Sequence, residues 1–140
     1  YGLVGSEMCI RDSEGSDPKH SFHYLGRDNT LYVFEAPIDL LSYISLHPEN
    51  WQEHNYVACC GTSSIPVLEM VRQLPQLRQV CLCLDNDDAG HTASERMAEL
   101  LKEHGLNAVR LVPQQKDWND DLTADQEIEN GRSDLCQTFC

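Results

Sequence analysis

The chain has 140 residues, of which 41% are hydrophobic and 24% are charged. This length and composition are typical of one folded domain and argue against a wholly disordered chain. The formal net charge of −13 excludes binding to DNA or RNA by bulk attraction, because such binding depends on Lys and Arg displacing counterions. No apolar run approaches the roughly 18 residues that cross a bilayer, and nothing near the start resembles a secretion signal.

The chain contains seven cysteines. An odd number of cysteines without a secretion signal predicts a reducing, cytoplasmic location. No C-x-x-C pair occurs, which argues against a zinc knuckle. Cys81 and Cys83 are two residues apart in an apolar run, and we expect them to be buried small residues on one face of a strand.

The two ends of the chain differ in character from its middle. Because the chain begins with Tyr1 and not with Met, we expect it to be part of a longer protein. Residues 2–13 resemble a translated sequencing adapter, the alternative being a genuine flexible leader, and residues 14–20 are typical of a linker. We therefore predict a leader and linker over residues 1–20, a folded domain over residues 21–122 and an acidic C-terminal tail over residues 123–140.

Strands and helices are expected to alternate along the middle of the chain. Apolar, β-rich runs predict strands at residues 30–35, 55–60, 79–84 and 107–112. Helical spacing predicts helices that start near Pro37, near Ser64 and at Ala89, and a short one around residues 124–130. This alternation predicts a single α/β domain with a four-stranded, mostly parallel sheet flanked by helices.

Acidic side chains follow two of the predicted strands. Glu35 ends the first strand, and Asp85 and Asp87 follow the third. Ligands of open parallel sheets bind at the carboxyl ends of the strands, and residues two apart in an extended segment project the same way. If the first and third strands are neighbours, Glu35 therefore faces Asp85 and Asp87.

Three carboxylates in one crevice repel one another. Two unit charges at 4 Å cost roughly 4 kcal/mol at an effective dielectric of about 20. Such a group is stable when it is protonated or when it binds a cation, and carboxylate oxygens suit Mg²⁺, with Mn²⁺ as an alternative.

Other interpretations of the acidic run are possible. An acid at a strand end is often only a turn former or a helix N-cap, and Asp88 is a candidate for that role. An EF-hand loop starting at Asp85 is excluded, because its fifth and twelfth positions are Ala89 and Arg96 instead of an oxygen ligand and Glu. A haloacid-dehalogenase-like phosphatase would carry its D-x-D pair after the first strand, not the third.

Three segments together resemble a Toprim domain: LYVFEAPIDLLSY at 31–43, CLCLDNDDAGHTAS at 81–94 and KDWNDDL at 116–122. The resemblance is greatest to the Toprim-like domain of primase-like proteins of plasmids and other mobile elements. It implies a general acid/base role for Glu35 and Mg²⁺ binding by Asp85 and Asp87. It also implies that Gly90 allows a close backbone approach at a helix start, and that Asp117 is a further metal ligand.

The resemblance implies Mg²⁺-dependent phosphoryl transfer on DNA or RNA, with further domains bringing the polynucleotide. Primer synthesis is the leading activity, DNA nicking is the second, and metal-dependent binding without turnover is the third. The chain departs from many primase-type members at Ala36, where they carry glycine. The tyrosines are expected to pack in the fold, so strand passage is not assigned.

Three residues near the predicted site have two open interpretations each. Asp39 lies one helical turn past Glu35, where it either supports the site or faces solvent. His91 either contacts substrate or lies on the surface. Trp118 either stacks on a base or, as we favour, packs against the sheet.

Overall fold

The computed structural model of the protein describes residues 21–139, so the predicted leader and linker lie outside the described residues. Its sheet contains β1 (His23–Tyr24), β2 (Thr30–Phe34), β3 (Asn55–Ala58), β4 (Gln79–Leu82) and β5 (Asn107–Arg110) in the order β1-β3-β2-β4-β5. Strands β2 to β5 are parallel, whereas β1 pairs antiparallel with β3. The predicted single α/β domain with a mostly parallel sheet is confirmed.

The sheet has five strands instead of the predicted four. The additional strand, β1, has two exposed residues, too few to produce a period-2 pattern in the sequence. The four predicted strands are all present but end one or two residues earlier than expected. Residues such as Glu35 and Cys83 therefore lie just past the strand ends, in the segments that form the candidate site.

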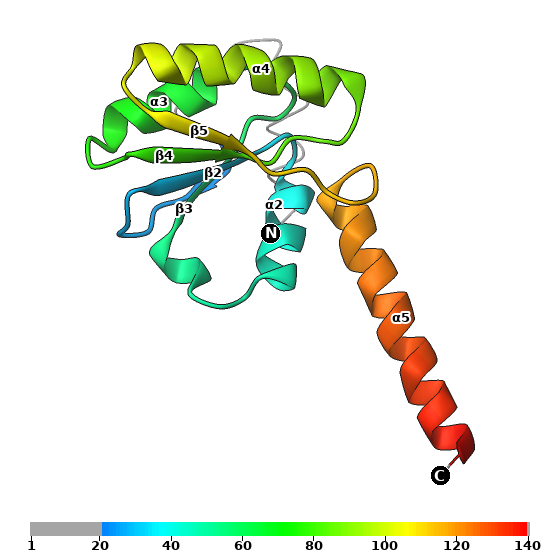
Figure 1. Ribbon diagram of the computed structural model, residues 1–140. Coiled ribbons are helices and arrows are strands. Elements are labelled where there is room, and N and C mark those ends of the chain that lie inside the picture. The colour runs from blue at the N-terminus through cyan, green and yellow to red at the C-terminus, as the bar shows by residue number, and fades with distance from the viewer. Residues whose placement is uncertain (1–20, 140) are drawn as a thin grey trace.

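Helices cover both faces of the sheet (Figure 1). Helices α3 (Ile65–Gln73) and α4 (Asp88–Glu103) lie on one face, and α2 (Pro37–Leu46) lies on the other. The connection from α2 to β3 contains one turn of 3-10 helix, η3 (Trp51–Glu53). Pro37 and Pro66 lie in the first turns of α2 and α3, where a missing backbone N–H costs no helical hydrogen bond.

Alternate residues of each strand pack against opposite helix layers. On the α3–α4 side, strand residues such as Leu31, Val33 and Leu82 form a core with Met70 and Met97. The α2 side is more aromatic, and its buried or partly buried side chains are Tyr32, Phe34, Tyr43, Trp51, Tyr56, Cys81, Cys83 and Trp118. The predicted burial of Cys81 and Cys83 on one face is confirmed.

The last helix, α5 (Trp118–Phe139), is much longer than the helix expected around residues 124–130. Its first turns pack against α2, and the helix then projects away from the sheet (Figure 1), with residues 125–135 exposed. The predicted boundary between domain and tail, at residues 122 and 123, falls inside this continuous helix. Among the described residues, no helix is long and apolar enough to cross a membrane.

Candidate metal centre

Glu35 and Asp85 meet at the carboxyl ends of two neighbouring strands. Strands β2 and β4 pair in parallel, with Val33 beside Leu82, so the chain leaves both strands at the same edge of the sheet. The backbone N–H of Asp85 donates to Glu35 Oε1 at 3.3 Å. The expectation that the first and third predicted strands are neighbours is therefore confirmed, and Glu35 lies next to the acidic segment.

Burial and the charges of neighbouring carboxylates raise the pKa of both carboxyls. Burial is the main cause at Glu35, followed by the negative charge of Asp85. The pKa of Asp85 rises to about 6 because of burial, then because of the charges of Asp117 and Asp87. A cation bound between these groups would remove the repulsion that raises both values.

Asp87 caps the N-terminus of α4. Its Oδ1 accepts a hydrogen bond from the backbone N–H of Gly90 at 2.7 Å. The capping role considered for Asp88 therefore belongs to Asp87, and Asp88 is exposed in the first helical turn. Capping occupies one carboxylate oxygen of Asp87, and its charge still acts on Glu35 and Asp85.

Gly90 brings the first turn of α4 against the backbone of the acidic segment. A Cβ at this position would lie 2.1 Å from the carbonyl oxygen of Asp85, far inside van der Waals contact. The close backbone approach expected at Gly90 is thus present. It fixes the segment from Asp85 to Asp87 against α4, so the two carboxylates have a rigid support.

Asp39 is the acid whose position the sequence left open. It lies on α2 and only 3% of its surface is exposed. Its Oδ1 accepts from the backbone N–H of Asn119 at 3.2 Å. Burial raises its pKa to about 7, and the charges of Asp117, Asp85 and Glu35 add to this rise. Asp39 therefore does not face solvent, and its hydrogen bond joins α2 to the first turn of α5. Its spacing of four residues from Glu35 was the available sequence signal.

Asp117 lies at the start of α5, close enough for its charge to raise the pKa of both Asp85 and Asp39. Its Oδ1 accepts from the backbone N–H of Asp120 at 2.8 Å. Its neighbour Lys116 holds the acidic segment through its backbone, because its carbonyl accepts from the N–H of Asn86 at 2.7 Å. The K-D segment and the D-x-D segment thus come together as the resemblance implied.

Arg110 is a basic component of the site that sequence reasoning missed. It ends β5, and its guanidinium reaches across the end of β4 to donate to the carbonyls of Leu84 at 2.7 Å and Asp85 at 2.8 Å. Burial lowers its pKa, which the nearby carboxylates partly offset. No motif marked it, because an arginine at the end of a strand is indistinguishable in sequence from a surface arginine.

His91 and Trp118 have different roles near the site. The His91 ring lies 3.1 Å from Asn86 Oδ1 and 3.4 Å from the Arg110 guanidinium, so it belongs to the rim of the acidic segment. Trp118 is 7% exposed, and its indole N–H donates to the Cys83 carbonyl at 2.9 Å. Packing against the sheet, the favoured interpretation of Trp118, is therefore confirmed.

The described acidic side chains do not form a complete set of metal ligands on their own. Among residues 21–139, no group of three or more His, Cys, Asp or Glu side chains is close enough together to hold a metal ion. Mg²⁺ is ordinarily held by one or two carboxylates together with waters and substrate phosphates. Asp85 Oδ1 is buried and has no hydrogen-bond partner within the described part of the chain, which is the state expected of an oxygen that binds such an ion.

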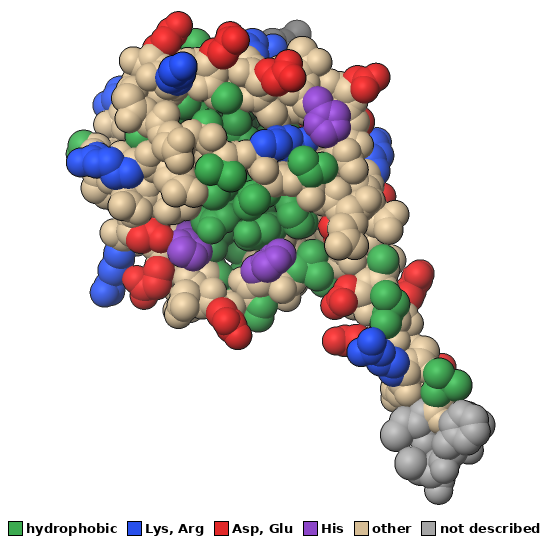
Figure 2. Space-filling view, viewed as in Figure 1, with side chains coloured by type: hydrophobic (Ala, Val, Ile, Leu, Met, Phe, Trp, Pro, Cys, Tyr) green, Lys and Arg blue, Asp and Glu red, His purple; other side chains and the backbone are tan. Residues whose placement is uncertain are grey.

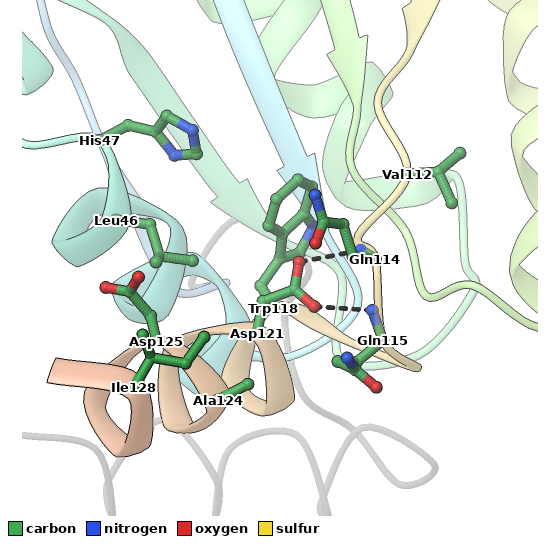
Figure 3. Close-up of a pocket in the computed structure, with 10 residues that line it drawn as sticks. All are labelled: Leu46, His47, Val112, Gln114, Gln115, Trp118, Asp121, Ala124, Asp125 and Ile128. Atoms are coloured by element: carbon green, nitrogen blue, oxygen red, sulfur yellow. Dashed lines mark hydrogen bonds between the residues drawn. The ribbon is translucent and has the colours of Figure 1, made fainter. Parts of the chain in front are cut away.

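A pocket of about 420 Å³ lies beside Trp118, between the end of α2, the segment after β5 and the first turns of α5 (Figure 3). The Asp121 carboxylate accepts from the backbone N–H groups of Gln114 and Gln115, at 2.9 and 2.7 Å. None of Glu35, Asp85 and Asp87 lines it. Asp121 therefore shapes the segment that joins β5 to α5 and is not part of the metal centre.

Two relatives match most of this chain in sequence. An uncharacterized protein of Mycoplasma pneumoniae is 30% identical over 111 residues, covering 74% of this chain and 50% of the relative. An uncharacterized protein of Bacillus anthracis is 27% identical over 143 residues, covering 86% of this chain and 41% of the relative. The chain thus spans half or less of the length of these relatives.

The fold matches primase structures. The primase fragment of the bacteriophage T7 primase-helicase protein aligns with a TM-score of 0.56 and 23% identity, over 76% of this chain and 44% of that one. Primase domains bound to an RNA/DNA hybrid, in a complex with the T7 lagging-strand DNA polymerase, align with a TM-score of 0.54 and 21% identity, over 77% of this chain and 54% of that one. A family model described as Toprim-like matches residues 32–122, from β2 to the start of α5. The chain therefore belongs to the Toprim-like family.

Proposed function

We propose that this domain carries out Mg²⁺-assisted phosphoryl transfer on DNA or RNA, with primer synthesis as the leading activity. The observation that carries the proposal is the buried and unpaired Asp85 Oδ1, lying beside Glu35 at the carboxyl ends of β2 and β4. Ligands of such sheets bind at this edge, and a buried carboxylate oxygen without a donor is suited to a hard cation.

The acids would divide the chemistry among them. Asp85 would bind Mg²⁺ or Mn²⁺, with the free oxygen of Asp87 and the carboxylate of Asp117 as further ligands. The bound ion would neutralise a substrate phosphate and stabilise the charge that develops during transfer. Glu35, whose pKa is raised by burial and by Asp85, would carry a proton to or from the reacting oxygen. Arg110 would hold the backbone of the acidic segment in place.

The negative charge of the chain opposes the approach of a polynucleotide. With a net charge of −13, the domain requires the metal ion and a basic partner to bring phosphates to this edge. The primase named in the similar structures motivates primer synthesis, and the resemblance motivates an origin in a replication protein of a plasmid or other mobile element. DNA nicking, and metal-dependent nucleic-acid binding without turnover, are the alternatives.

The test is a paired activity assay on the full chain. Primer synthesis is followed on single-stranded DNA with ribonucleotides and Mg²⁺, and nicking is followed on supercoiled plasmid. Whichever of the two activities the wild type shows, Glu35→Gln should reduce its rate by about 100-fold or more, the usual contribution of a general acid or base. Glu99→Gln, on the exposed side of α4, is the matched control. Equal activity of both variants would remove Glu35 from the mechanism. A wild type that binds oligonucleotide in the presence of Mg²⁺ but is inactive in both assays would favour binding without turnover.

A further inference from the structure

The α2 face of the sheet carries a pocket of about 400 Å³ that is separate from the metal centre. It lies between the C-terminal end of α2 and the middle of β2 and β3, and its lining includes Tyr32, Tyr43, Tyr56, His47, His54 and Glu49. Figure 2 shows hydrophobic side chains gathered in a hollow on this face, with histidine and acidic side chains at its rim. We call it the aromatic pocket.

Stacked rings form the walls of the aromatic pocket. Tyr32 and Tyr56 are cross-strand neighbours on β2 and β3, and their rings stack with centroids 5.4 Å apart. Tyr43 stacks on His47 with centroids 4.4 Å apart, and His54 closes the other side against Tyr32 at 5.2 Å. Tyr56 is buried, whereas Tyr32 and Tyr43 are partly exposed and His47 is exposed, so these three rings border the hollow. The face of an aromatic ring carries the negative part of its quadrupole.

The charges near the aromatic pocket are acidic. Glu49 lines it and is exposed, and Asp28 is hydrogen bonded to the His54 ring. The charge of Asp28 reaches the pocket, because it contributes to the raised pKa of the Tyr32 and Tyr56 phenols after the larger effect of burial. The described residues of the lining include no Lys or Arg, and its basic groups are the imidazoles of His47 and His54, the second of which is paired with Asp28. Glu49 is therefore the acid that a bound cation would meet at the rim.

We infer that the aromatic pocket is a docking site for an arginine side chain presented by a basic protein segment. Ring faces with an acid at the rim are the chemistry that recognises a planar guanidinium, which stacks and bonds to carboxylate at once. The volume is within the range of sites that bind side-chain-sized groups. The net charge of −13 complements a basic partner over the whole domain. This inference does not depend on the proposed catalysis.

A peptide of alternating Gly and Arg is the probe, and binding to the full chain is followed by NMR shifts of the tyrosine rings and by calorimetry. Any polycation is attracted to so acidic a chain, so the variants must separate the pocket from the net charge. Glu49→Lys changes the charge at the rim, and Glu99→Lys makes the same change on exposed α4, on the opposite face of the sheet. Tyr32→Leu removes a ring face and keeps an apolar side chain.

We expect the peptide to shift the rings of Tyr32 and Tyr43, and Glu49→Lys to weaken binding by about tenfold, as charge reversal next to a cation in water requires. Glu99→Lys should weaken it about twofold or less. Tyr32→Leu should weaken it by about threefold or more through the lost cation–π contact, with the melting curve used to confirm folding. Equal losses in the two lysine variants would overturn the inference. So would ring shifts on adding single-stranded oligonucleotide, or a peptide-free dimer that buries Tyr32.

Discussion

Replacing Asp39 with Asn should stabilise the protein more at pH 8 than at pH 5. The pKa of this buried carboxyl is raised from its ordinary 3.8 to about 7 by burial and by the charges of Asp117, Asp85 and Glu35. The folded state therefore holds a proton that the unfolded state has already released, and stability falls as the pH rises from about 4 to about 7. Asn keeps an oxygen to accept from the Asn119 N–H and carries no charge.

The magnitude follows from the width of that pH window. A gap of about three pKa units corresponds to about 4 kcal/mol in the free energy of unfolding above pH 7, at 1.36 kcal/mol for each unit. About 1.5 kcal/mol of that penalty is already present at pH 5. The advantage of Asp39→Asn over wild type should therefore grow by about 2 to 3 kcal/mol between pH 5 and pH 8. The weaker hydrogen bond of the amide lowers this advantage equally at both pH values and leaves the difference unchanged.

Urea unfolding of both proteins at pH 5 and pH 8 measures this difference. Glu99→Gln, which removes one charge from the exposed side of α4, controls for the general effect of lowering the net negative charge. An advantage of Asp39→Asn that is the same at both pH values, or no larger than that of Glu99→Gln, would refute a buried Asp39 with a raised pKa.

Three further effects follow from the same geometry. Gly90→Ala should destabilise the protein by about 1 to 3 kcal/mol in urea unfolding, because its Cβ would lie 2.1 Å from the Asp85 carbonyl oxygen. Gly131→Ala is the control on α5, where the space around the glycine is open, and it should be neutral or slightly stabilising. Trp118→Phe should lower the free energy of unfolding by about 1 to 3 kcal/mol in the same assay, because the Cys83 carbonyl loses its buried donor. A cost near zero would contradict that hydrogen bond. Mg²⁺ should raise the melting temperature more at pH 8 than at pH 5, since the pKa of Asp85 is about 6 and a protonated carboxyl binds the ion poorly; equal shifts at both pH values would argue against binding at Asp85.

Most of the fold was predictable from local patterns, because strands β2 to β5 and helices α2 to α4 each carry their own signal. Apolar β-rich runs followed by Pro37 or Pro66 mark the transitions from strand to helix. The alternation of strands and helices then predicts a parallel sheet without any tertiary information. Two elements carried no such signal. Strand β1 has only two residues, both exposed, and residues 125–135 of α5 are all exposed. Neither segment therefore produces a clear periodicity in hydrophobic residues.

The acidic site was predictable where chain topology decides it. Glu35 and Asp85 had to meet once β2 and β4 were neighbours, and the D-x-D spacing singled out Asp87. Asp39 and Arg110 were harder, because their roles depend on the packing of α2 against α5 and on the reach of a long side chain across a strand end. Such placements arise from tertiary contacts, which the sequence pattern around each residue does not encode.

The most direct test of the metal centre is to find where a paramagnetic ion binds. Mn²⁺ added to the ¹⁵N-labelled full chain at pH 7.5 broadens amide signals near its binding site. We expect the signals of residues 35–36 and 85–88 to disappear first, and Asp85→Asn to require a much higher Mn²⁺ concentration for the same loss. Broadening that begins on the exposed acidic half of α5, or that is unchanged in Asp85→Asn, would contradict a metal centre at the carboxyl ends of β2 and β4.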